Sequence, residues 1–185
     1  MNVQETGFEG LYIIEPRVFR DERGYFFESY NQRDLQENNI TFRSLQDNES
    51  FSEKNVIRGL HYQLNPMAQA KLIRVIKGRI RDVVLDMRKG SATYGRWKAV
   101  DLDSESKCQL FIPRGFAHGY SVLSNEAIIL YKCDNYYSPE HERGIAFDDP
   151  SLGIDWSVDK DTSVISEKDR SNPPFSEAEN NFYSE

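Results

Sequence analysis

KLIRVIKGRIRDVVLDM, residues 71–87, is the stretch that decides the fold. It contains two apolar runs rich in β-branched residues, Leu72–Ile76 and Ile80–Met87. Such runs, when bounded by turn residues, are typical of β-strands. Lys77-Gly78 separates the two runs, and a short glycine-containing break between strands predicts a tight hairpin.

The same pattern continues on both sides of this stretch. The only clear early helix runs from about Gln32 to Asn38 and ends in the pair Asn38-Asn39. Many strands with few helices favour an all-β fold, an antiparallel sandwich or jelly-roll barrel. One domain is expected over residues 1–185, with a polar tail at 176–185. The other predicted strands are Leu11–Phe19, Tyr25–Tyr30, Val56–Tyr62, Trp97–Leu102, Gln109–Ile112, Tyr120–Leu123 and Ile128–Lys132.

Composition excludes several classes of function. The net charge is −7 and the basic residues are scattered, so no stripe offers a surface to a nucleic-acid polymer. No apolar run is long enough to cross a bilayer, and the N-terminus has no signal-peptide pattern, so we expect a cytoplasmic protein. Cys108 and Cys133 have neither the spacing of a redox pair nor that of a zinc site, and are expected to be buried reduced thiols.

The chain has three histidines, and two of them lie in apolar segments. His141 follows Ser138-Pro139-Glu140 and is expected in a solvated loop. His61 lies in the predicted strand Val56–Tyr62, where it shares a face with Gly59 and Gln63. Two interpretations of His61 are equally open: it is a structural histidine, or it lines the interior of a barrel.

His118 closes the spacing P-x-G-x-x-H in Pro113-Arg114-Gly115-Phe116-Ala117-His118. This spacing resembles the second sequence motif of the cupin superfamily, in which that histidine is a metal ligand. The paired histidines of the first cupin motif have no counterpart in this chain. The resemblance therefore supports the fold and argues against a metal.

Three more residues have unremarkable local settings. Lys71 opens a strand, where a lysine is usually a solvated edge residue. Tyr131 closes the apolar run that begins at Ala127 and looks locally like a core tyrosine. Asp169 is one charge in a polar run.

The order of longer segments is more specific, because together they resemble the dTDP-4-dehydrorhamnose 3,5-epimerase family from about Phe8 to Pro174. The matching segments are 21–28, 46–50, 58–63, 71–75, 82–88, 113–119, 131–132 and 166–169.

The resemblance implies a role for each matching residue. His61 is the base, Asp169 orients it, Lys71 stabilises the enolate oxygen, and Tyr131 is the acid on the opposite face of the sugar. Arg58 holds the nucleotide phosphates, Gln46 and Asn48 add polar contacts, and His118 lies beside the sugar. Arg23, Phe26 and Glu28 belong to an N-terminal segment, about residues 1–30, that reaches the active site of a partner subunit in a homodimer.

The chemistry fits these residue types. A ketone at carbon 4 of a dTDP-linked 6-deoxy sugar acidifies the hydrogens on carbons 3 and 5, so a base near neutral pKa, a cation at the oxyanion and an acid on the other face are sufficient. No cofactor is expected, since the dinucleotide-binding fingerprint is missing. Three alternatives stay open: an epimerase acting at carbon 3 or 5 only, a cupin that binds a sugar nucleotide without converting it, and a metal-dependent cupin oxygenase.

Overall fold

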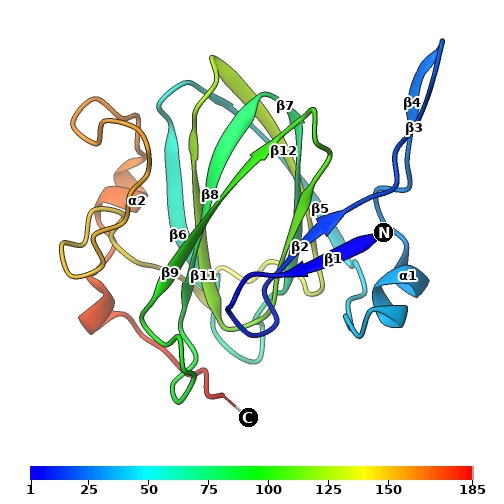
Figure 1. The fold of residues 1–185 in the computed structure, drawn as a ribbon. Coiled ribbons are helices and arrows are strands. Elements are labelled where there is room, and N and C mark those ends of the chain that lie inside the picture. The colour runs from blue at the N-terminus through cyan, green and yellow to red at the C-terminus, as the bar shows by residue number, and fades with distance from the viewer. Residues whose placement is uncertain (185) are drawn as a thin grey trace.

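The computed structural model describes residues 1–184, which form two antiparallel sheets that face each other (Figure 1). The expected antiparallel β-sandwich is confirmed. One sheet has six strands, in the order β1 (Asn2–Glu5), β2 (Tyr12–Glu15), β10 (Gln109–Ile112), β7 (Lys71–Lys77), β12 (Glu126–Cys133) and β5 (Gln46–Glu53). The other has five, in the order β13 (Glu142–Gly144), β6 (Ile57–Gln63), β11 (Phe116–Val122), β8 (Arg79–Asp86) and β9 (Trp97–Asp103).

The remaining elements lie outside the two sheets. Strands β3 (Phe19–Asp21) and β4 (Gly24–Phe26) form a separate hairpin that projects away from the sandwich (Figure 1). Helix α1 (Gln32–Glu37) begins at Asn31, whose side chain caps it. The short helix α2 (Glu167–Arg170) and a 3₁₀ turn, η1 (Phe175–Glu177), belong to the C-terminal part. Within residues 1–184 no helix is long and apolar enough to cross a membrane.

Strand β8 shows why the five-stranded sheet needs an apolar layer against each of its two faces. Its alternate residues Ile80 and Val84 point into the core between the sheets, whereas Val83 and Leu85 belong to a second cluster on the outer face. All four side chains are fully buried. A strand that is apolar on both faces is stable only when both faces are covered.

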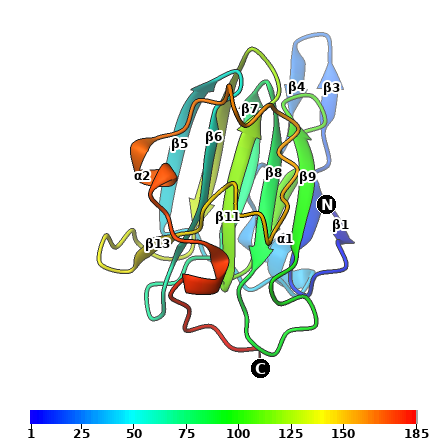
Figure 2. The ribbon, with the colours of Figure 1, turned by 90° about the vertical axis from the view of Figure 1, so that its left-hand side faces the viewer.

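The C-terminal part of the chain provides the outer cover of the five-stranded sheet. It crosses that face between β13 and the C-terminus (Figure 2), and its Ile145, Trp156, Ile165 and Phe182 pack in the outer cluster. The polar tail at 176–184 is held in place, because Asn180 donates a hydrogen bond to the Met87 carbonyl and Phe182 is buried. The six-stranded sheet is covered in the same way by α1, through Leu35.

The expected hairpin at Lys77-Gly78 is wrong. Strand β7 pairs with β10 and β12, and β8 pairs with β9 and β11, so the two runs belong to different sheets. Gly78 has φ of +84°, and a Cβ there would lie 2.1 Å from the Glu126 carbonyl oxygen. The glycine therefore forms a tight corner between sheets rather than a turn within one.

Other boundaries also differ from expectation. The predicted strand Leu11–Phe19 ends at Glu15, before Pro16, and the predicted strand Tyr25–Tyr30 ends at Phe26. Strands β1, β5 and β13 were not predicted. Cys133 is buried as expected, but Cys108 is partly exposed; both thiols are free.

Strands β6 and β11 approach unusually closely at Gly59 and Gly119. A Cβ on Gly59 would lie 2.5 Å from the Cα of Gly119, and φ of Gly59 is +120°. The β6–β11 register shifts between His118 and Tyr120 at the same place, while His118 stays opposite His61. The two glycines thus let two histidines lie side by side on neighbouring strands.

We predict that Gly59→Ala lowers the free energy of unfolding by about 2–5 kcal/mol, because it adds both backbone strain and a steric clash. Chemical denaturation monitored by circular dichroism measures this. Gly153→Ala is the matched control: its φ is +58°, but nothing lies within 4 Å of the added Cβ, so it should cost only about 1 kcal/mol. Equal losses in the two variants would contradict the close approach of β6 and β11.

Candidate active site

A cavity of about 220 Å³ opens between the two sheets. Its walls come from five strands, three of the six-stranded sheet and two of the five-stranded sheet. A wider groove of about 420 Å³ shares Arg58 and His61 with it and runs along α2. The cavity is lined by Ser50, Arg58, His61, Lys71, His118, Gly119, Tyr120 and Tyr131.

His61 and Asp169 form a close pair at the junction of cavity and groove. His61 Nε2 lies 2.6 Å from Asp169 Oδ1, and Asp169 Oδ2 accepts a hydrogen bond from the Gly59 N–H at 3.2 Å. Burial opposes ionisation of Asp169, but the hydrogen bonds from His61 and Gly59 outweigh it, so its pKa lies below the usual value. An ionised carboxylate on one ring nitrogen fixes the imidazole tautomer and leaves Nδ1 unprotonated, as a base requires.

Asp169 is placed by the first turn of α2. The Ser166 side chain caps this turn by accepting a hydrogen bond from the Asp169 N–H at 3.1 Å. Val164, just before it, pairs in parallel with Val56 at the start of β6. The polar composition of residues 166–170 favoured a solvated position for Asp169, but its side chain is only 5% exposed.

Lys71 and Tyr131 lie on neighbouring strands on the opposite wall. Lys71 begins β7 and faces Cys133 in register on β12, two residues beyond Tyr131. Burial lowers the pKa of Lys71, against the opposing effect of nearby negative groups. Burial raises the pKa of Tyr131, so its phenol stays protonated at neutral pH and can act as an acid.

Of three further predicted ligand-binding residues, Arg58 lines the cavity, whereas Gln46 and Asn48 lie on β5 outside its lining. Arg58 donates to Ser52 Oγ at 3.0 Å and to the Phe51 carbonyl at 3.1 Å, which holds its guanidinium at the cavity. Gln46 donates to Asn48 Oδ1 at 2.9 Å. Gln46 and Asn48 share one face of β5, opposite Cys133 and Tyr131.

His118 lies inside the cavity, where its Nε2 is 3.0 Å from Asp82 Oδ2. Burial lowers the pKa of His118, against the opposing effect of Asp82, so the ring is neutral at neutral pH. Within residues 1–184, no group of three or more His, Cys, Asp or Glu side chains is arranged to hold a metal ion.

Arg23, Phe26 and Glu28 lie away from this cavity. Arg23 and Phe26 are on the projecting β3–β4 hairpin, where Arg23 pairs with Asp21 and Phe26 is 66% exposed. Glu28 contacts Asn31 at the start of α1. None of the three lines the cavity of its own chain.

The structure adds residues that sequence reasoning missed. Ser50 and Ser52 on β5 both lie within hydrogen-bonding distance of the Tyr120 hydroxyl, at 3.1 and 3.2 Å. The signal was the polar alternation Gln46, Asn48, Ser50, Ser52, which is the inner face of an unpredicted strand. Asp82 was hidden for a different reason, since it is one of four charged residues in β8 and nothing in the sequence distinguishes it from Arg79, Arg81 and Asp86.

The comparisons agree with this geometry. The sequence profile of the family described as dTDP-4-dehydrorhamnose 3,5-epimerase matches residues 5–177. A dTDP-4-dehydrorhamnose 3,5-epimerase of Methanothermobacter thermautotrophicus is 51% identical, over 94% of each chain. The crystal structure of a Legionella pneumophila dTDP-6-deoxy-D-glucose-3,5-epimerase, in complex with dTDP-4-keto-L-rhamnose, has a TM-score of 0.94 and 42% identity over 100% of this chain and 99% of that one. A 3′-monoepimerase of Streptomyces bikiniensis in complex with dTDP-quinovose is more distant, with a TM-score of 0.84 and 31% identity over 92% of this chain and 86% of that one.

A β-sandwich of the cupin type that gathers a His–Asp pair, a lysine and a tyrosine at one cavity has the groups that acid–base catalysis requires. The profile match and the relatives specify it further. The chain belongs to the dTDP-4-dehydrorhamnose 3,5-epimerase family.

We predict that activity declines at alkaline pH as Lys71 loses its proton. The ammonium is present below the pKa of Lys71 and lost above it, and that pKa is lowered from 10.5. Lys71→Arg keeps a cation that does not titrate in this range. It should lower turnover roughly tenfold through altered geometry, yet move the alkaline limb of the pH–rate profile to higher pH. A limb that stays in place would assign it to another group.

Proposed function

We propose that this chain converts dTDP-4-dehydro-6-deoxy-D-glucose to dTDP-4-dehydro-L-rhamnose, by inverting carbons 3 and 5 through enolate intermediates. The observation that carries the proposal is the convergence of His61, Asp169, Lys71 and Tyr131 at one cavity. The cytoplasm is the compartment we expect.

In this proposal, residues on the two facing sheets perform different steps of the proton transfer. His61, oriented by Asp169, removes the proton next to the ketone, and Lys71 stabilises the negative charge that develops on the carbonyl oxygen. Tyr131 returns a proton from the other face. Because burial raises the pKa of Tyr131, its phenol is available as a donor throughout neutral pH.

The nucleotide lies toward the entrance in this proposal. Arg58 binds the diphosphate, since a guanidinium forms paired hydrogen bonds with phosphate oxygens. Gln46 and Asn48 contact the nucleotide nearby, and His118 lies beside the sugar. The lining of the cavity by both Arg58 and His118, and the position of Gln46 and Asn48 on β5 beside Tyr131 and Cys133, support this arrangement.

The active form is proposed to be a homodimer. The β3–β4 hairpin carries exposed Phe19, Tyr25 and Phe26, each at least 50% exposed, on a projection with little core of its own. Aromatic side chains on such a projection favour insertion into another surface. We propose that it brings Arg23, Phe26 and Glu28 to the cavity of the partner subunit.

Epimerisation at one carbon is the second candidate function. The 3′-monoepimerase similarity supports it at 31% identity, against 51% for a relative named as a 3,5-epimerase. Deuterium incorporation from heavy water, read by NMR at carbons 3 and 5, distinguishes the two, because only a double epimerase labels both positions in inverted product.

We predict that Tyr131→Phe separates exchange from inversion. The variant keeps the ring but removes the donor, so His61 can still remove and return a proton on one face. It should incorporate deuterium into at least one carbon but form inverted product about a hundredfold to ten-thousandfold more slowly. The effect should fall on kcat rather than on nucleotide binding.

Two further variants calibrate that experiment. His61→Ala should abolish exchange at both carbons, and Asp169→Asn should reduce it less completely, because the imidazole remains. Inverted product formed by Tyr131→Phe at near wild-type rate would remove Tyr131 from the mechanism. Exchange by His61→Ala would identify another base.

We predict that mixing two inactive variants restores activity if Arg23 serves the neighbouring cavity. His61→Ala and Arg23→Ala are each expected to lose most activity. A mixed dimer has one cavity with both defects and one with neither, so random exchange should recover about a quarter of wild-type activity per subunit pair.

Light scattering should report the dimer in all samples. Mixing His61→Ala with Lys71→Met is the matched control, because both residues line the same cavity of one chain and each cavity of the mixed dimer remains defective. Recovery in this control, or no recovery with Arg23→Ala, would contradict a shared site.

A further inference from the structure

Two aspartates on the inner face of β8 are fully buried but differ in their surroundings. Asp82 and Asp86 are both 0% exposed, and they lie four residues apart on one face of the strand. Both face β11, opposite Tyr120 and Phe116 respectively. A buried carboxylate is costly unless hydrogen bonds or a counter-charge compensate it.

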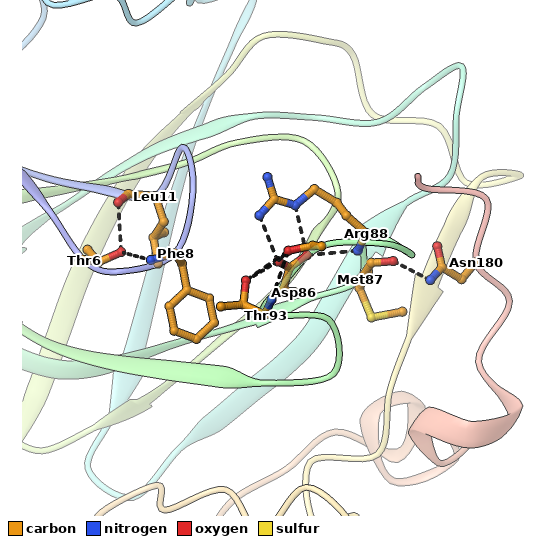
Figure 3. Close-up of polar contacts among 9 residues, drawn as sticks. Thr6, Phe8, Leu11, Asp86, Met87, Arg88, Thr93 and Asn180 are labelled. Atoms are coloured by element: carbon orange, nitrogen blue, oxygen red, sulfur yellow. Dashed lines mark hydrogen bonds and ion pairs between the residues drawn. The ribbon is translucent and has the colours of Figure 1, made fainter. Parts of the chain in front are cut away.

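The cost of burying the Asp86 carboxylate is offset by hydrogen bonds and a counter-charge from residues close to it in sequence. It accepts hydrogen bonds from the N–H, Nε and Nη2 of Arg88 and from Thr93 Oγ1, at 2.6–2.9 Å (Figure 3). Ser91 Oγ donates a further hydrogen bond to it at 2.7 Å. The Arg88 guanidinium supplies the counter-charge and also lies over the Phe116 ring. Asp86 therefore has a structural role at its end of the sandwich.

Asp82 has only one hydrogen-bond partner, and that partner lines the catalytic cavity. Its Oδ2 meets His118 Nε2 at 3.0 Å, whereas its Oδ1 is buried without a partner among residues 1–184. Since burial lowers the pKa of His118, that ring offers Asp82 a hydrogen bond but no positive charge at neutral pH.

Lys71 is the cation available to Asp82. The groups around the Lys71 ammonium are Asp82 on β8, Glu142 on β13, Cys133 and Tyr131 on β12, and the two histidines, His118 on β11 and His61 on β6. Glu142 is already engaged by Lys168, with 2.5 Å between Nζ and Oε2, and by the Tyr137 hydroxyl. Cys133 is a neutral thiol, because burial raises its pKa. Asp82 is thus the negative group near Lys71 that has no other cation.

We propose that Asp82 is a positioning residue of the epimerisation site, which holds His118 through a hydrogen bond to one carboxylate oxygen and favours the ammonium of the nearby Lys71 through its negative charge. This inference rests on the proposed function, since it assigns Asp82 a role in stabilising the enolate. It joins Asp82 and His118, on the same sheet as His61, with Lys71 on the facing sheet, and of these three groups only Lys71 and His118 face the substrate.

The two effects of Asp82 are distinct. By accepting from Nε2–H, it fixes the His118 tautomer, so that Nδ1 is an acceptor for a sugar hydroxyl. By opposing the desolvation of Lys71, it keeps the cation that the developing oxyanion requires.

The test compares Asp82→Asn with Asp86→Asn, which removes an equally buried carboxylate from the same strand face. Asp82→Asn should lower kcat at least tenfold, leave dTDP binding within about twofold, and move the alkaline limb of the pH–rate profile to lower pH. The limb moves downward because the ammonium, lost as pH rises, is then less stabilised. Asp86→Asn should lower the melting temperature without moving the limb.

A double-mutant cycle with Lys71→Met tests whether Asp82 acts through the lysine. If it does, Asp82→Asn should change turnover by less than about threefold in the Lys71→Met background. Asp82→Ser, which leaves room for a water at His118, serves as a second neutral variant if Asp82→Asn does not fold, and it should give the same limb shift.

Four outcomes overturn the proposal while the wild-type protein remains an active epimerase: unchanged turnover, an unmoved limb, additive losses in the cycle, or a limb shift of equal size in Asp86→Asn. Absence of turnover by the wild-type protein on dTDP-4-dehydro-6-deoxy-D-glucose would instead contradict the proposed function itself.

Discussion

The five-stranded sheet is apolar on both faces, and its outer face must be covered by the C-terminal part of the chain. Leu60, Tyr62, Val83 and Leu85 point outward and would be exposed without the cover formed by residues such as Trp156 and Ile165. Burying a side chain of this size is worth roughly 1.5–3 kcal/mol, so the cover is a large share of the stability of the fold. The same segment leads directly into α2, and the position of α2 brings Asp169 within 2.6 Å of His61, 108 residues away in sequence. The catalytic pair is therefore a consequence of how this sheet is buried.

The candidate site lies where the apolar core between the sheets meets the polar residues that line the cavity. The interior between the sheets is filled by aliphatic side chains such as Ile73, Val75 and Ile129. Lys71 and Tyr131 lie on the same two strands as these residues, so their positions are fixed by the packing of the core beside them. Low polarity affects the two groups differently. Burial raises the pKa of Tyr131 and keeps its phenol protonated, but it lowers the pKa of Lys71, so the ammonium that a developing oxyanion requires depends on the negative groups nearby.

Local sequence patterns predicted the strands whose residues are apolar or alternate clearly, including β10 at its observed bounds and most of β7, β8 and β12. They failed where pairing depends on distant contacts: the break at Lys77-Gly78 has the composition of a hairpin, and only the packing against Glu126 makes it a corner between sheets. For the site, the alternation around His61 indicated that His61 and Leu60 face opposite sides. Local patterns left Lys71, Tyr131 and Asp169 as ordinary residues, and only the family resemblance grouped them. Asp82 lies in a matching segment but received no role, because it is one of several charges in β8 and only its burial distinguishes it.

Charge balance in the cavity bears on the proposed contribution of a second subunit. Asp82 and Asp169 are offset by Lys71 and Arg58, so the described residues that line or support the cavity carry little excess positive charge. A nucleoside diphosphate brings about two further negative charges, and Lys168, at the groove, is already paired with Glu142. Burying unbalanced phosphate charge would be strongly unfavourable. The β3–β4 hairpin carries Arg20 and Arg23 beside Asp21 and Glu22, and Arg23 is paired with Asp21 although its side chain is 84% exposed. In the proposed homodimer, the Arg23 guanidinium would exchange Asp21 for the diphosphate at the neighbouring groove, which gives the projection a physical role in binding the nucleotide.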